Sequence, residues 1–200
     1  MSKKNIAILM VICAFTLITT AAAQSLPISF QGEVPKDSNK KTSLGRYATA
    51  AEAYRMYNAN PDKVFLLDVR TPEEYALLGH APQAFNIPSK LWTGKFDLEK
   101  KDYGLVNNPD FEAIVKEKFR PEDTIMVMCR SGVRGAEAVN RMAKIGFTNV
   151  YNVTDGFEGE KITEEDSYYK GKRLKNGWRN SGLPWTTDLD PKLVYLPTSK

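Results

Sequence analysis

The chain of 200 residues is poor in the side chains that most often bind metals, since it has two cysteines and one histidine, His80. A single histidine cannot supply a paired-histidine metal site and leaves little scope for imidazole acid–base catalysis. The sequence also shows no cofactor-binding motif. We therefore expect no metal and no organic cofactor, and we interpret His80 as a structural residue that closes a turn.

The chain also lacks an apolar run at its start that is long enough to cross a membrane, which takes about 20 residues. Residues 6–18 are apolar, follow Lys3 and Lys4, and precede small residues that end at Ala23. This order is typical of a secretory signal peptide. We expect residues 1–23 to be cleaved after Ala23 and the mature protein to be periplasmic or secreted, with no membrane attachment.

Charge of one sign is not in excess. The formal net charge of +4 falls to +2 when Lys3 and Lys4 leave with the signal peptide. A nearly neutral protein gives no reason to expect nucleic acid as a partner. Since Cys13 leaves as well, Cys129 is the single remaining cysteine, and it can form neither an internal disulfide nor a zinc cluster. It is therefore either buried and inert or reactive.

The composition, with 42% hydrophobic and 26% charged residues, is that of one ordinary globular domain. Residues 24–45 mix proline, glycine and polar residues, and they predict an extended N-terminal arm without chemistry of its own. Two capping-box patterns then mark helix starts, Thr49 with Glu52 and Thr71 with Glu74.

Short apolar runs at residues 64–69, 124–128 and 150–153 predict strands that are buried on both faces, as in parallel sheets. Residues 111–119 and 136–146 place apolar side chains at helical spacing. Strands that alternate with helices predict an α/β domain with a mainly parallel sheet and helices on both faces.

Cys129 directly follows the predicted strand 124–128, and ligand sites in open α/β sheets lie beyond the carboxyl ends of the strands. The residues that come next combine two glycines with two arginines; they are Arg130, Ser131, Gly132, Val133, Arg134 and Gly135. Such a turn can direct backbone N–H groups inward at a helix N-terminus, where they bind an anion and favour a thiolate. We therefore predict that Cys129 is a nucleophile and that Arg130 and Arg134, chiefly Arg134, hold an anionic substrate.

Transfer of a sulfane sulfur suits this site because it needs almost no proton shuttle. The thiolate attacks the outer sulfur of thiosulfate or a related anionic donor, sulfite leaves, and a persulfide remains among the backbone donors. A thiol or cyanide acceptor then removes that sulfur.

Several stretches resemble the rhodanese family. They are residues 68–75, 79–88, 129–135 and 146–156, together with Gly177, Trp178 and residues 182–184. The resemblance covers residues 46–187 and implies a three-layer domain with a five-stranded parallel sheet, sulfurtransferase activity and a persulfide on Cys129. Four residues separate Cys129 from Arg134, one fewer than in the related phosphatases. The smaller loop favours sulfur over phosphate or arsenate.

The chain departs from the family at residues 160–176, which are inserted where the family has a short connection. We expect this insertion to project on the active-site side as a lid or docking surface, with its acidic and basic halves paired and with Tyr168 and Tyr169 as anchors. We expect residues 188–200 to be a C-terminal tail.

Other conspicuous residues receive structural interpretations. Asp68 and Arg70 are expected to support the loop, one of them by pairing with Arg134, and Glu73 and Glu74 to cap a helix. Four aromatic residues are expected to pack in the core; they are Tyr54, Tyr57, Trp92 and Trp185.

Two alternatives to a small-molecule sulfurtransferase stay open. One is a binding or sulfur-carrier module of the same fold that acts on a partner protein. The other is a phosphatase or arsenate reductase.

Overall fold

The computed structural model describes residues 30–197, so the predicted signal peptide lies outside the described residues. At its centre is a five-stranded sheet with the strand order β1-β7-β6-β2-β3, and every neighbouring pair is parallel. The strands are β1 (Tyr47–Ala48), β2 (Val64–Asp68), β3 (Phe85–Asn86), β6 (Thr124–Met128) and β7 (Val150–Val153). This architecture confirms the predicted α/β fold with a parallel sheet.

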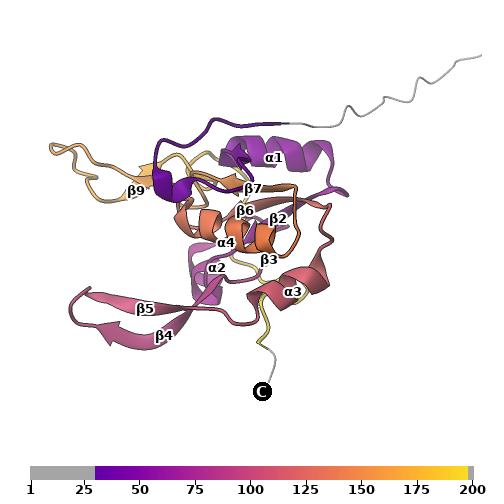
Figure 1. Cartoon of the computed structure of the whole chain (residues 1–200). Coiled ribbons are helices and arrows are strands. Elements are labelled where there is room, and N and C mark those ends of the chain that lie inside the picture. The colour runs from indigo at the N-terminus through magenta and orange to yellow at the C-terminus, as the bar shows by residue number, and fades with distance from the viewer. Residues whose placement is uncertain (1–29, 198–200) are drawn as a thin grey trace, which may run out of the picture.

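Four α-helices accompany the sheet (Figure 1). They are α1 (Ala50–Ala59), α2 (Pro72–Leu78), α3 (Phe111–Lys118) and α4 (Val133–Lys144). Side chains of a strand alternate between its two faces. In β6, Met126 packs with the α1 side of the core, whereas Ile125 and Val127 pack with α3 and α4. Helices therefore cover both faces of the sheet, which is the middle of three layers. Within the sheet, β6 is the central strand.

Local sequence signals set the helix starts. The side chain of Thr49 accepts a hydrogen bond from the Glu52 backbone, and Thr71 does the same for Glu74; both capping boxes are complete. In each box the glutamate carboxylate accepts a hydrogen bond from the backbone N–H of its threonine. The two predicted helix starts are confirmed, and so is the capping role of Glu74.

Two antiparallel hairpins project from the same side of the domain (Figure 1). The first joins β4 (Lys90–Asp97) to β5 (Asp102–Asn107), and the second joins β8 (Glu160–Lys161) to β9 (Arg173–Lys175). The first was not predicted. Trp92, expected in the core, lies on β4 with 46% of its surface exposed, so that expectation is wrong.

The second hairpin is the predicted insertion, and part of the expectation for it is confirmed. Its two ends pair as strands, and Lys170 forms an ion pair with Glu165 across the turn. Tyr168 and Tyr169 do not anchor it, because they are 86% and 51% exposed and contact each other edge to face at the tip. Backbone pairing at the root holds the hairpin instead.

The segments at either end of the domain also pack against it. Residues Ser38–Lys40 form a short 3-10 helix, and the backbone carbonyl of Lys40 accepts a hydrogen bond from buried Asn152. At the other end the Asn86 N–H donates to the carbonyl of Leu193 at 2.7 Å, which places the C-terminal tail beside β3. In residues 30–197 no helix is both long and apolar enough to cross a membrane.

Candidate active site

Cys129 lies immediately after β6, the middle strand, at the carboxyl end of the sheet. Its side chain is 1% exposed, and its sulfur accepts a hydrogen bond from the N–H of Gly132 at 3.2 Å. The next residue after Gly132 begins α4, so the sulfur is held beside a helix N-terminus. Both a backbone donor and the positive end of the helix dipole stabilise negative charge at this position.

The loop requires glycine at two positions. Gly132 has φ +101, and a Cβ atom there would lie 2.4 Å from the carbonyl oxygen of Thr154. A Cβ atom on Gly135 would lie 2.4 Å from the side-chain oxygen of Asn152. A side chain at Gly132 would clash with the backbone just after β7, and a side chain at Gly135, in the first turn of α4, would clash with Asn152 of β7.

Arg134 forms a two-pronged ion pair with Glu74, with both N–O distances at 2.7 Å. Burial alone would raise the pKa of Glu74, but the hydrogen bonds and charge of Arg134 more than offset it and lower that pKa. In turn, Glu74 raises the pKa of Arg134 against the effect of burial. Arg134 therefore stays charged, but its charge is already matched by a carboxylate.

Asp68 and Arg70 are fully buried and pair with each other, with a shortest N–O distance of 2.6 Å. Arg70 also donates to the carbonyl of Gly79 and lies over the ring of Phe157 at 4.2 Å. Burial would lower the pKa of Arg70, and the neighbouring Asp68 more than reverses that effect. Neither residue pairs with Arg134, so this pair ties the end of β2 to the following turn.

Glu158 lies beneath the loop and connects it to the second hairpin. Its backbone N–H donates to the carbonyl of Arg130, and its carboxylate lies 3.3 Å from the Arg130 guanidinium and 3.7 Å from that of Arg70. Arg173, on β9, donates to the carbonyl of Gly159. Burial and then the charge of Arg130 lower the pKa of Arg173. The root of β8–β9 therefore lies close to the Cys129 loop.

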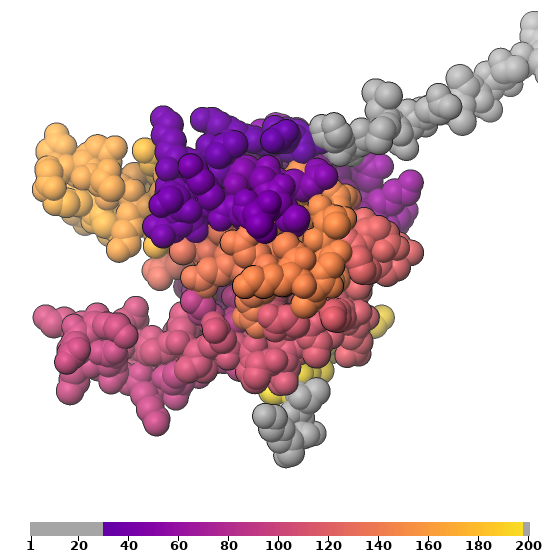
Figure 2. Space-filling view, in the orientation of Figure 1, coloured from indigo at the N-terminus to yellow at the C-terminus, as the bar shows by residue number. Residues whose placement is uncertain are grey.

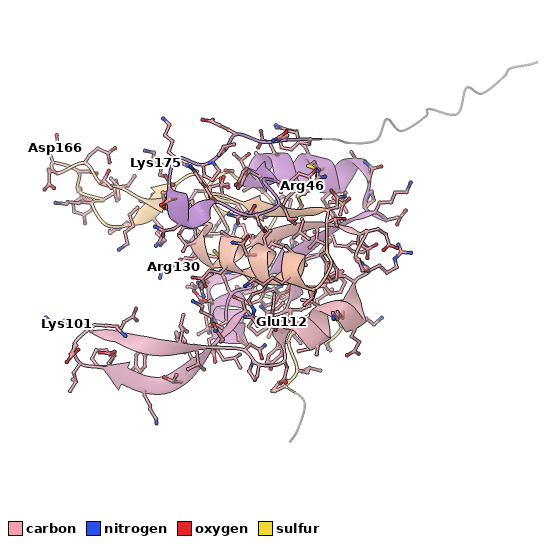
Figure 3. The ribbon with its side chains drawn as sticks, viewed as in Figure 1. Arg46, Lys101, Glu112, Arg130, Asp166 and Lys175 are labelled. Atoms are coloured by element: carbon pink, nitrogen blue, oxygen red, sulfur yellow. The ribbon has the colours of Figure 1, made fainter. Side chains whose placement is uncertain are left out.

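A pocket of about 210 Å³ opens at Cys129. Its floor is made by loop and helix residues, namely Cys129, Arg130, Ser131, Val133, Arg134 and Glu74. Its remaining wall comes from β4–β5, through Trp92, Asp102, Tyr103 and Leu105. In the space-filling view the two hairpins stand out as separate prongs (Figure 2), and Arg130 lies on the side between Lys101 of one and Asp166 of the other (Figure 3).

His80 takes no part in this pocket. Its ring stacks on Tyr75 at 3.6 Å and contacts the Tyr75 carbonyl through Nδ1, while its backbone pairs with Thr186. Burial lowers the pKa of His80. In the described part of the chain no group of three or more His, Cys, Asp or Glu side chains is placed to hold a metal ion.

The family model of the rhodanese-like domain matches residues 49–161, which include four of the five strands of the sheet, α1 to α4 and the Cys129 loop. The chain belongs to the rhodanese-like domain family. The match ends where the β8–β9 hairpin begins, so most of that hairpin lies beyond the matched segment.

Known proteins agree with this assignment. An uncharacterized protein of Rickettsia prowazekii is 35% identical over 136 residues, which cover 68% of this chain and 93% of the relative. Thiosulfate sulfurtransferase 16, chloroplastic, of Arabidopsis thaliana is 37% identical over 118 residues, 59% of this chain and 76% of that protein. The crystal structure of Rv0390 from M. tuberculosis has a TM-score of 0.55 at 28% identity and covers 71% of this chain and 99% of its own. The rhodanese-like fold and a sulfurtransferase-type activity are supported together.

The structure of this rhodanese-like domain brings the whole predicted loop, Cys129 to Gly135, to one place at the end of β6. It also adds site residues that the sequence reasoning missed. Glu74 is the partner of Arg134, and Glu158 that of Arg130. The pocket wall from β4–β5 was missed as well, because its apolar residues do not alternate regularly with polar ones: Leu91 and Trp92 are adjacent on β4, and so are Leu105 and Val106 on β5.

Proposed function

We propose that this rhodanese-like domain is a sulfurtransferase that moves a sulfane sulfur from thiosulfate or a related anionic donor to a thiol or cyanide acceptor. The observation that carries the proposal is the placement of Cys129 at the end of β6, with its sulfur accepting the N–H of Gly132 at the start of α4. This geometry suits a sulfur nucleophile that works as an anion without a neighbouring base.

The reaction has two balanced steps. The Cys129 thiolate attacks the outer sulfur of thiosulfate, the S–S bond of the donor breaks, and sulfite leaves with the bonding electrons. The new persulfide carries one negative charge. An acceptor thiolate or cyanide then attacks the terminal sulfur, and Cys129 leaves again as a thiolate, so no cofactor, oxidant or reductant is required.

Different residues stabilise the negative charge of the persulfide and that of the donor. The N–H of Gly132, which donates to the Cys129 sulfur, stabilises the persulfide as a donor of an oxyanion hole does. Arg130 is half exposed and reaches solvent, so it is the freer cation for the sulfonate part of the donor. Arg134 contributes a charge that it shares with Glu74, and it fixes α4 against α2.

We further propose that the protein is exported and begins at Gln24 after removal of residues 1–23. The support is the order of charged, apolar and small residues at the start of the sequence. N-terminal sequencing of the protein from cell fractions tests this; Met1 in a membrane fraction would contradict it.

Mass spectrometry after exposure to thiosulfate tests the central proposal. The reduced protein should gain the mass of one sulfur atom on Cys129, and Cys129→Ser should abolish both this adduct and turnover. A folded, reduced protein that stays unmodified would instead favour a binding module. Phosphate release from p-nitrophenyl phosphate that depends on Cys129 would favour a phosphatase.

A further inference from the structure

The two arginines of the Cys129 loop differ in how firmly they are held. Arg134 forms two hydrogen bonds with Glu74, both at 2.7 Å, and 14% of its side chain is exposed. Arg130 lines the same pocket with 49% of its side chain exposed. Its one ion pair within residues 30–197 joins Nε to the carboxylate of Glu158 at 3.3 Å. A half-exposed arginine can adopt many side-chain conformations, so this contact with Glu158 is what restricts them.

Glu158 is fixed to the loop by its backbone. Its N–H donates to the carbonyl of Arg130 at 3.0 Å, and the N–H of Phe157 donates to the carbonyl of Cys129 at 2.7 Å. The Glu158 carbonyl accepts the side-chain amide of Asn180 at 2.9 Å. Glu158 and Arg130 therefore meet twice, once through the backbone and once through their charged groups. This double contact gives the buried carboxylate a defined place relative to Arg130.

Arg70 does not take this carboxylate away from Arg130. Its Nη1 lies 3.7 Å from Oε1 of Glu158, which is too long for a hydrogen bond, and neither atom has a hydrogen-bond partner within residues 30–197. Arg70 instead pairs closely with Asp68, at 2.6 Å. Asp68, Arg70, Glu158 and Arg130 thus form a row of alternating charges. Arg130 is the end of the row that reaches solvent.

The exposed end of this row suits a sulfonate. The pair with Glu158 uses Nε of Arg130, so it leaves the two terminal nitrogens to a ligand. These nitrogens form a planar fork that can donate to two oxygens of one oxyanion. Thiosulfate carries three oxygens on its central sulfur, away from the sulfur that is transferred. Because Arg130 directly follows Cys129, the fork and the nucleophile belong to adjacent residues.

We propose that Glu158 is a positioning residue that holds the Arg130 guanidinium where its fork receives the sulfonate of thiosulfate, while the outer sulfur meets Cys129. This inference rests on the proposed function. Glu158 acts on the loading step and not on removal of the sulfur, because a thiol or cyanide acceptor has no sulfonate. A carboxylate near an anion site ordinarily weakens anion binding, whereas here removal of its charge should weaken it.

Glu158→Gln tests this role because it removes the charge and keeps the size of the side chain. It should raise KM for thiosulfate by about 3- to 10-fold, the effect of having to immobilise one flexible side chain on binding. Discharge of the preloaded persulfide by 2-mercaptoethanol should stay within about twofold of wild type. Glu160→Gln is the matched control, since Glu160 pairs with Lys40 at 2.7 Å, and it should leave KM unchanged.

Coupling to Arg130 separates positioning from a general structural role. Arg130→Met should raise KM for thiosulfate at least as much as Glu158→Gln does, and the double variant should differ from Arg130→Met by less than about twofold. Effects that multiply in the double variant would contradict positioning. Arg130→Lys keeps the charge but loses the fork, and it should resemble Arg130→Met. A wild-type KM in Arg130→Lys would overturn the inference even if Glu158→Gln failed to fold.

Failure of this inference and failure of the proposed function give different results. Loading of Cys129 by thiosulfate is measured by mass in the wild type. If the wild type does not load, the proposed sulfur transfer is wrong. If it loads and folded Glu158→Gln has an unchanged or lower KM, Glu158 does not position Arg130, and the proposed function stands.

Discussion

Hairpin β4–β5 borders the Cys129 pocket along its strands, whereas hairpin β8–β9 approaches the site only at its root. The first contributes four lining residues, among them Trp92 and Asp102. The second places Arg173 and Gly159 next to Glu158, and its tip, with Tyr168 and Tyr169, points to solvent. Similar hairpins beside one nucleophile therefore have different tasks: the first shapes the pocket, and the second braces the loop from below.

The largest expected effect concerns the root of β8–β9. Gly159 has φ +79, and a Cβ atom there would lie 2.2 Å from the carbonyl oxygen of Asn176. Gly159→Ala should therefore lower the free energy of unfolding by more than about 3 kcal/mol. Gly171, near the tip, has φ +82 but no atom within 4 Å of that position, so Gly171→Ala should cost only about 1 kcal/mol. Urea unfolding measures both, and equal losses would show that the root has no special role.

The second effect concerns the pocket floor beneath β4–β5. Glu74→Gln leaves Arg134 without its carboxylate and should lower the free energy of unfolding by about 2 to 3 kcal/mol at pH 7, since both side chains are largely buried. Because folding lowers the pKa of Glu74, the pair stabilises the protein fully above the usual pKa of about 4.3 and loses this contribution as pH falls through the lower folded value.

Urea unfolding as a function of pH checks this expectation. The gap between wild type and Glu74→Gln should be constant near neutrality and should close in the acid range. A gap that widens toward low pH would contradict the assignment of the pKa shift to Arg134.

The third prediction is a change that affects the root of β4–β5 and leaves the root of β8–β9 unchanged. Arg141, on α4, donates to the carbonyls of Ser89 and Asn108, where β4–β5 leaves the domain, and pairs with Glu112. Arg141→Leu should lower the free energy of unfolding by about 1 to 2 kcal/mol. It should also speed amide hydrogen exchange in β4–β5 without changing β8–β9. Lys144→Leu, an exposed change on the same helix, is the matched control and should alter neither hairpin.

The smallest effect concerns the tip of β8–β9. Backbone bonds between Ile162 and both Gly171 and Lys172 close the hairpin, so residues 163–170 can be replaced by a short glycine linker. Thiosulfate loading and transfer to small thiols should stay within about twofold of wild type. Transfer to a bulky protein thiol should change if the tip is a lid or docking surface. Unchanged rates for small and bulky acceptors alike would show that the tip is neither a lid nor a docking surface.

Much of the body of the domain could be predicted because its signals are local. The capping residues Thr49 and Thr71 fix helix starts through bonds to residues three positions later, and buried runs such as residues 124–128 fit only a strand covered on both faces. Cys129 follows such a strand, and glycines follow Cys129 in the sequence. From this order we could predict that the site lies at the carboxyl end of the sheet.

The rest depended on contacts between distant segments. Nothing near Arg134 in the sequence reveals that Glu74, sixty positions earlier, is its partner. Trp92 was assigned to the core because large aromatic residues are usually buried, yet here it lies on a hairpin that is exposed on both faces over most of its length. Tyr168 and Tyr169 failed as anchors for the same reason: composition does not show whether a second surface is available to cover them.

The β4–β5 hairpin leaves the domain and returns to it at a single point. The N–H of Asn108 donates to the carbonyl of Ser89 at 3.0 Å, and its side chain donates to the carbonyl of Pro88 at 2.9 Å. A chain whose exit and return lie this close together can change the length of the intervening segment at little entropic expense. Residues 90–107 thus behave as an exchangeable cassette: a foreign hairpin grafted between Ser89 and Asn108 would give the same nucleophile a different pocket wall while the sheet and its helices stay as they are.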